Sequence, residues 1–430
     1  MREFMDYVHG AFYEATGWNR GNSYATLNET PDALLNFHTP RGLRLTLSSL
    51  ASPNFATSYQ LGSVGVVDGS ISYLFSSVPL RLLLTPRSEN VPLPELLRSY
   101  RALTPLDRPL TPQPATTEGP AGPQNVHDAS LFYGRMYLPT SQLEGLVVKR
   151  ITPALQLQFS AVSSQHLRNG GTALGLAQYD VGRYALEGLA SSDGGLLGLR
   201  GVYNFGGDAE AASDRPTPSA SNNGERERIY GRFSTGGEIY YGTLNKSGGI
   251  SLGGRFATLP SHKGTPLAAT VTLTPLMGNI AASYAVVAGP HCSLATRMEF
   301  NVFSYESAWA VGMELWRKPF TRITTDEAPA VPRGKERSFR AKMEWRLDTS
   351  EEEMLALSNN MMLSSPIKER KYQDDEYAGV LKARLDQNLR IGLLWEGRVK
   401  SLLFSLGSGI DLRQHNKPFR TLGLEIQFSS

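Results

Sequence analysis

Apolar and polar residues alternate one by one along most of the chain after Gly42, and a period of two is typical of β-strands. The last segment of the chain shows the alternation most cleanly. One face of that strand carries only large apolar side chains: Leu422, Leu424, Ile426 and Phe428. The other face carries Thr421, Gly423, Glu425 and Gln427. An unbroken apolar face that ends in an aromatic residue favours the last strand of a transmembrane barrel.

About twenty segments show the same alternation, and short turns such as Asp68-Gly69 and Asp193-Gly194-Gly195 are predicted to join many of them. The predicted strands are 42–50, 55–66, 69–77, 130–138, 142–149, 153–163, 173–180, 182–190, 196–205, 228–242, 248–259, 267–274, 278–288, 292–304, 307–317, 337–348, 377–386, 389–397, 401–412 and 419–428.

Two of these segments predict which face is which. In 389–397, Leu393 and Trp395 alternate with Leu394 and Glu396, and 337–348 sets Trp345 on the face opposite Arg340 and Lys342. A soluble sheet alternates in the same way, with its apolar face turned inward. However, strands of about ten residues match the thickness of a bilayer, and hardly any helix is predicted that could cover the sheet. A soluble propeller would need a repeat of about 40–50 residues, which the sequence lacks. The prediction is an all-β transmembrane barrel.

The first sixteen residues follow a helical period. Their apolar residues recur three and four positions apart: Phe4, Tyr7, Val8, Ala11, Phe12 and Ala15. This helix either lies in the mouth or against the wall of a barrel, or packs on a soluble core. The predicted organisation is a helical segment over 1–40 followed by the barrel over 41–430.

Four long insertions separate the strands. Residues 79–128 are rich in proline, with a short helix expected at 95–101, and 206–227 and 318–336 interrupt the pattern further on. These three follow the third, ninth and fifteenth strands, so they are expected on one side of the barrel, opposite the N-terminus. The fourth, 349–376, follows the sixteenth strand and is expected on the N-terminal side, with a helix at 350–357.

Composition narrows the class of protein. The chain has 430 residues, with 43 basic against 40 acidic residues, so its charge gives no reason to expect nucleic acid as a partner. A single cysteine, Cys292, excludes an internal disulfide, and we expect a small buried or lipid-facing side chain there. The first ten residues carry Glu3 and Asp6 and lack an apolar core, which argues against a secretory signal or a cleaved presequence.

The residues of common catalytic and binding motifs are present but not in productive arrangements. The seven histidines have no metal-ligand spacing, and the run Gly195, Gly198 and Gly201 lies in a predicted strand rather than before a helix, where a phosphate loop would need it. We therefore expect no enzyme, no cofactor and no metal.

The C-terminal strand also matches the sorting pattern of mitochondrial outer-membrane barrels. That pattern is a polar residue, any residue, glycine, any two residues, a hydrophobic residue, any residue and a hydrophobic residue. Here the four defined positions are Thr421, Gly423, Ile426 and Phe428. We predict that they act as a sorting signal.

Several stretches resemble one fungal family. They are Met1 to Val8, Gly17-Trp18-Asn19, Thr39 to Leu43, Ser48 to Phe55, 59–77 and the C-terminal strand. Together these are similar to the mitochondrial distribution and morphology protein 10 family. The resemblance implies a nineteen-stranded barrel of the mitochondrial porin type, with the N-terminal segment in the lumen and the first and last strands parallel. One of the twenty predicted strands is then surplus, and 142–149 with 153–163 is where we expect the miscount.

The same resemblance implies function. The family is the barrel subunit of the encounter structure between endoplasmic reticulum and mitochondria, whose lipid-transfer subunits carry phospholipid. It is also an accessory subunit of the sorting and assembly machinery for outer-membrane barrels. The expected partners are those two complexes and the lipid bilayer, and the expected location is the mitochondrial outer membrane at contact sites. The alternative is a general solute pore like the voltage-dependent anion channel, which the charged lumen permits.

Overall fold

The computed structural model describes residues 1–64, 66–80, 91–106, 128–165, 167, 170–206, 208, 231–260, 262, 264–318, 377–413 and 419–429. The chain divides into two compact units, Met1–Arg317 with Tyr377–Ser430, and Lys318–Glu376. The fold below is that of the first unit. The strand expected at 337–348, the helix expected at 350–357 and nearly all of the insertion at 206–227 lie outside the described residues.

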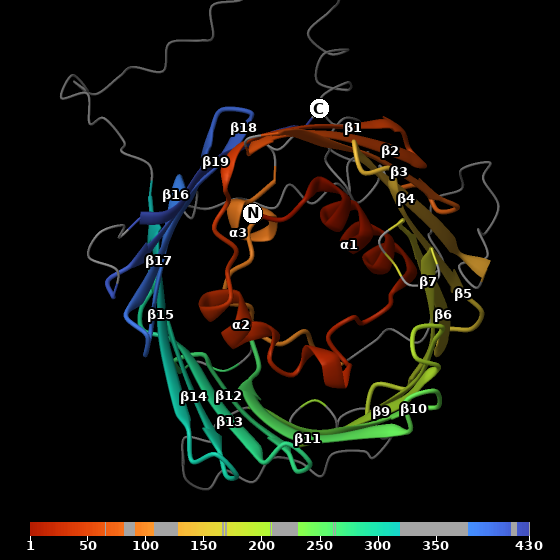
Figure 1. Ribbon diagram of the computed structural model, residues 1–430, viewed down its shortest axis with the longest axis vertical. Helices are drawn as coiled ribbons and strands as arrows, with labels where there is room; N and C mark the ends of the chain where they lie inside the picture. The colour runs from red at the N-terminus through yellow and green to blue at the C-terminus, as the bar shows by residue number, and fades with distance from the viewer. Residues whose placement is uncertain are drawn as a thin grey trace, which may run out of the picture. The chain divides into compact units, whose positions relative to one another are not determined.

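Nineteen strands form one closed sheet, which Figure 1 shows as a ring of arrows. The strands are β1 (Gly42–Ser52), β2 (Phe55–Val64), β3 (Val66–Ser76), β4 (Ser130–Leu138), β5 (Gln142–Arg150), β6 (Leu155–Ser163), β7 (Gly171–Asp180), β8 (Tyr184–Ser191), β9 (Leu196–Phe205), β10 (Gly231–Gly242), β11 (Ser247–Thr258), β12 (Leu267–Thr274), β13 (Asn279–Val287), β14 (Cys292–Asn301), β15 (Ser307–Arg317), β16 (Gly379–Asp386), β17 (Arg390–Val399), β18 (Leu402–Asp411) and β19 (Phe419–Ser429).

Each strand pairs antiparallel with the next, and β1 and β19 close the ring as a parallel pair. Because neighbouring strands alternate in direction, a closed ring with an odd number of strands must contain one parallel pair. The count of nineteen strands therefore requires the parallel seam between β1 and β19. Closure gives the backbone of every strand a partner on both sides, which a hydrocarbon environment requires. The predicted barrel, the count of nineteen and the parallel closure are confirmed.

The expected source of the surplus strand was wrong. Residues 142–149 and 153–163 correspond to β5 and β6, two full strands that pair with each other. The segment 337–348 lies outside the described residues, and β15 pairs directly with β16 from Ala310↔Asp386 to Arg317↔Gly379. Alternation at 337–348 indicated a strand, but alternation carries no information about pairing partners.

One of the two predicted turns is confirmed. Gly194 and Gly195 have φ of 64° and 57° in the turn between β8 and β9, a conformation that favours glycine. Asp68 and Gly69 instead lie inside β3, where Asp68 is paired with Gly62. The chain reverses earlier, between Val64 and Val66.

Three strands that precede long insertions, β3, β9 and β15, end at one rim of the barrel, which we call the long-connection rim. The insertions that follow them therefore leave the barrel on one side, as expected. The segment 349–376 lies outside the described residues. The placement of the N-terminus opposite the insertions was wrong, because helix α1 (Phe4–Thr16) packs on Ala56, Leu74 and Leu131, which lie near the strand ends at this same rim.

Three further helical segments lie inside the ring in Figure 1: a 3-10 turn η1 (Tyr24–Thr26), α2 (Glu29–Leu35) and α3 (Leu93–Leu96). α3 is shorter than the helix expected at 95–101 and begins earlier. Pro94 lies in its first turn, where a missing backbone N–H costs nothing.

Candidate functional site: the barrel wall, its seam and the occupied lumen

The outer face of the barrel is apolar and the inner face is polar. On β17, Trp395 is 47% exposed on the outside, whereas the next residue, Glu396, is 0% exposed on the inside. Leu381 and Lys382 on β16 repeat the arrangement, with Lys382 only 1% exposed. The face assignment predicted for β17 is therefore confirmed, while that for Trp345 falls outside the described residues. Apolar residues turned outward and charges turned inward are typical of a membrane barrel.

The seam brings the predicted sorting residues to the closing strand. β1 and β19 run in register from Gly42↔Gly423 to Ser48↔Ser429. Thr421 and Gly423 share the inner face of β19 with Gln427, and Ile426 and Phe428 share its outer face. The four residues lie on one strand but on two faces. Their role in sorting stays a prediction.

Gly423 has a packing role that the sorting pattern did not reveal. An ideal Cβ at Gly423 would overlap the backbone carbonyl of Pro40 and lie 2.7 Å from the nitrogen of Arg41. The chain therefore crosses the inner wall directly over Gly423 just before it enters β1. Any side chain at this position would push that crossing away from the wall.

Two segments occupy the lumen, and we call them together the luminal insert: residues 1–41 and 91–106. Val8 and Phe12 of α1 are completely buried against the inner wall. The helix predicted at the N-terminus is confirmed, and its apolar face packs on the wall of the barrel. The other segment crosses from β17 to β9 and β10, since Arg398 bonds to Val91 O at 2.7 Å and Asp208 accepts from Leu106 N at 2.7 Å.

The two parts of the luminal insert are bonded to each other. The backbone N–H of Arg2 donates to Leu96 O at 3.0 Å, and Thr104 donates to Asn19 Oδ1 at 3.1 Å. Burial and the neighbouring Arg101 guanidinium lower the pKa of Arg2 to about 10, and burial raises the pKa of Tyr100 to about 12. The helix expected at 95–101 did not show that 91–106 crosses the lumen, because a proline-rich stretch indicates a loop without indicating where it lies.

A buried charge cluster holds the luminal insert to β15, β16 and β17. Lys382 Nζ lies 3.1 Å from Glu396 Oε2, and the amino group of Met1 bonds to Glu396 Oε1. Lys382 also donates to the carbonyl of Arg98, and Glu314 accepts from the backbone N–H of Tyr100 at 3.4 Å. Charges removed from water persist only when they are paired, so this cluster fixes the insert in one place. Its members are hundreds of residues apart in sequence, so no local motif could have revealed it.

Further polar contacts fasten the rest of the N-terminal segment. Asn22 donates to Asp180 Oδ1 at 2.7 Å and accepts from Asn204 at 2.8 Å, all three being buried. Further along, Asp32 of α2 pairs with Arg297 of β14. Because β7, β9 and β14 contribute, the segment follows the inner wall around much of its circumference, as Figure 1 shows.

Among the described residues, no three His, Cys, Asp or Glu side chains come close enough to hold a metal ion. Cys292 is partly exposed at the start of β14 and is free.

None of the described helices combines the length and the apolar character that a membrane-spanning helix needs.

The family model for mitochondrial distribution and morphology protein 10 matches residues 1–430. The chain belongs to the mitochondrial distribution and morphology protein 10 family. A relative from Chaetomium globosum is 60% identical over 95% of this chain and 99% of its own length. Relatives from Podospora anserina and Neurospora crassa are 56% and 55% identical over the whole of both chains. All three carry the family's name.

Membership of the mitochondrial distribution and morphology protein 10 family gives the chain a role in the distribution and morphology of mitochondria. A barrel fold in a mitochondrial family is consistent with an outer-membrane location. The resemblance seen in the sequence at both ends of the chain is thus confirmed over its full length.

Proposed function

We propose that this chain is a non-enzymatic barrel of the mitochondrial outer membrane with two jobs. It anchors the tethering complex between endoplasmic reticulum and mitochondria, where lipid-transfer subunits exchange phospholipid and so maintain mitochondrial morphology. It also serves as an accessory subunit of the sorting and assembly machinery for outer-membrane barrels.

The observation that carries the membrane part of this proposal is the arrangement of the wall. Outward residues such as Leu45, Trp309 and Trp395 are large, apolar and exposed, while Arg232 and Lys382 are buried inside. In water this arrangement would expose a continuous apolar surface far larger than soluble monomers tolerate. Against lipid it costs nothing.

The occupied lumen supports an anchor over an open pore. The luminal insert is bonded to two buried ion pairs, Lys382–Glu396 and Arg232–Asp208, the second at 3.0 Å. The amino group of Met1 and the carbonyl of Arg98 contact the first pair, and the backbone N–H of Leu106 donates to Asp208 of the second. A solute pore needs a clear path and gains nothing from sixteen further residues, 91–106, held across the lumen. A scaffold, by contrast, gains a more rigid wall from the residues held across its lumen.

One experiment separates the proposed jobs from the alternative of a solute pore. The chain is expressed in a fungal strain that lacks its own copy, and mitochondria are washed with alkaline carbonate and then solubilised for affinity purification. We expect the chain to stay with the membrane and to co-purify with lipid-transfer subunits and, in a separate pool, with the barrel-assembly subunit. Release by carbonate, or co-purification with neither group together with a large steady conductance in planar bilayers, would overturn the proposal.

A further inference from the structure

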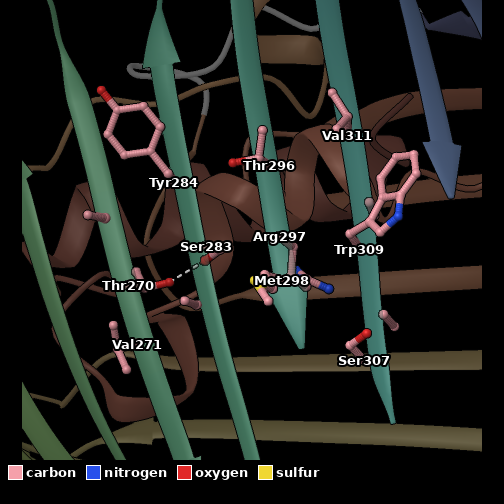
Figure 2. Close-up of a pocket in the computed structure, with 14 residues that line it drawn as sticks. Thr270, Val271, Ser283, Tyr284, Thr296, Arg297, Met298, Ser307, Trp309 and Val311 are labelled. Atoms are coloured by element: carbon pink, nitrogen blue, oxygen red, sulfur yellow. Dashed lines mark hydrogen bonds between the residues drawn. The ribbon is translucent and has the colours of Figure 1, made fainter. Parts of the chain in front are cut away.

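A hollow of about 490 Å³ lies in the outer face of the barrel over β12, β13, β14 and β15. Figure 2 views it from outside, with Tyr284 and Trp309 on either side of Thr296 and Met298. Lumen-facing neighbours on the same strands, such as Thr270 and Ser283, are buried and bond to each other instead.

The hollow exists because small and large outward residues are sorted into register. Tyr284 is flanked by Ala269 on β12 and Thr296 on β14. Two residues further along β14, away from the long-connection rim, Met298 is flanked by Ala282 and Trp309. Tyr284 and Met298 therefore each stand beside a small side chain, so that the wall is recessed where an ordinary row of leucines would be flush.

The recess is braced from within. Leu34 and Leu35 of α2 pack on Ala285 and Ala295, on the inner face of the same strands. An ideal Cβ at Gly312 of β15 would lie only 2.7 Å from the carbonyl oxygen of Leu34, so the helix backbone rests directly on the wall. A wall held in this way cannot collapse into the recess, and the recess is preformed.

We propose that this recess binds the hydrocarbon tail of a membrane phospholipid. The proposal rests on the outer-membrane placement proposed above. The lining side chains that project outward are uncharged, since Arg297 turns inward to Asp32, so the occupant must be apolar. The volume falls within the range of ordinary ligand sites. An empty recess would forfeit dispersion contacts along its whole lining, and the medium that faces it consists of acyl chains.

The test uses the full-length barrel, purified in detergent, and phosphatidylcholine with brominated acyl chains, which quenches tryptophan on contact. Trp309 lines the recess, and Trp395 is similarly exposed on the outer face of β17, two strands beyond the recess. We expect the brominated lipid to quench one component of the tryptophan fluorescence, and this quenching should saturate when lipid and protein are present in about equimolar amounts. Trp309→Phe should remove this component, and Trp395→Phe should retain it.

A second variant fills the recess while leaving Trp309 unchanged. Ala282→Leu places a larger apolar side chain on the floor, and half-quenching should then require several-fold more lipid. Ala177→Leu, at an exposed position on β7 away from the recess, is the matched control and should leave the titration unchanged. Native mass spectrometry should show a retained phospholipid on the wild type and on Ala177→Leu that Ala282→Leu loses.

If lipid quenches Trp309 and Trp395 gradually and to the same extent, the recess is not a specific lipid site. The outward orientation of the wall would still stand. A recess occupied by the membrane-spanning segment of a partner, with no lipid bound, would likewise overturn the lipid proposal and leave the orientation of the wall intact. If neither tryptophan is quenched even in bilayers made only of the brominated lipid, the membrane placement itself fails, and with it the proposed function.

Discussion

The carbonyl of Pro40 lies flat against Gly423, with no room for a side chain between them. This contact joins the end of the luminal insert to the strand that closes the barrel. It links two features that the sequence presents separately: a glycine in a C-terminal sorting pattern, and the point where the N-terminal segment becomes β1. Gly423 is therefore needed for packing at the strand that closes the barrel, whether or not it also acts in the sorting signal.

Replacing Gly423 with alanine should weaken the folded barrel even where no import machinery is present. Overpacking against backbone that cannot rotate away costs about 1–3 kcal/mol or more. The measurement is refolding from urea into detergent, followed by heat-modified mobility on a gel. Gly249→Ala is the control, because it lies on the inner face of β11 with open space around its Cβ position. Equal refolding of the two variants would contradict the packing role.

Phe428 separates sorting from packing. Its side chain lies on the outer face, paired in register with Leu47 and Leu402. We expect Phe428→Ala to refold in detergent almost as the wild type does, because truncation on the lipid side leaves no buried group unpaired. In isolated mitochondria the same variant should be imported but not assembled. Normal assembly of a variant changed at both Gly423 and Phe428 would remove the sorting hypothesis.

Charge placed on the outer face should cost more than charge placed on the inner face of the same strand. Ile426→Arg puts a guanidinium into hydrocarbon at about 2–4 kcal/mol near the midplane. Glu425→Arg faces the lumen, where its main penalty is repulsion from Arg44, its partner in register on β1. Folding stability in lipid vesicles measures the difference. Equal losses at the two positions would mean that the faces are assigned wrongly.

Breaking the buried charge cluster should destabilise the barrel strongly. Lys382→Met takes one of two cations from the buried Glu396, which keeps the amino group of Met1, and removing one partner of a buried pair costs up to about 3–5 kcal/mol. Adding Glu396→Gln should recover part of the loss. Lys149→Met is the control, since both side chains of its ion pair with Asp128 are exposed and the pair is worth at most about 1 kcal/mol. Urea unfolding of the three variants gives the comparison.

The packing of α1 should depend on pH through His9. Burial lowers the pKa of His9 to about 4, with Asp6 opposing the shift and Arg20 adding to it. The imidazole is neutral when folded, so its packing is fully stable above about pH 6.5 and loses about 3 kcal/mol as pH falls towards 4. The protection of the α1 amides against hydrogen exchange, corrected for the intrinsic exchange rate at each pH, should fall over that range, and His9→Phe should abolish the effect. A profile that His9→Phe leaves unchanged would assign the titration to another group.

The strands were predictable from the sequence and their pairing was not. Residues such as Trp395 and Glu396 alternate visibly because a wall with lipid on one side and polar groups on the other imposes a period of two. The segment 337–348 has the same alternation, yet β15 pairs directly with β16. Register and closure depend on residues far apart in the chain, which periodicity does not record.

The contents of the lumen were predicted only at the N-terminus. The helical period of Phe4 to Ala15 indicated α1, but either a barrel wall or a soluble core could have received it. Residues 91–106 have no period, and the contacts that place them join positions such as Arg98 and Lys382. Long-range hydrogen bonds of this kind leave no trace in a single sequence.

Cysteine accessibility along β17 tests the orientation of the wall most directly. Single cysteines at positions 393, 394, 395 and 396, in a background that lacks Cys292, are reconstituted in liposomes and exposed to lipid-soluble and water-soluble maleimides. Positions 393 and 395 should react only with the lipid-soluble reagent, and positions 394 and 396 should react with neither until the barrel is unfolded. Reaction of 393 and 395 with the water-soluble reagent would place the apolar face in water and contradict the account.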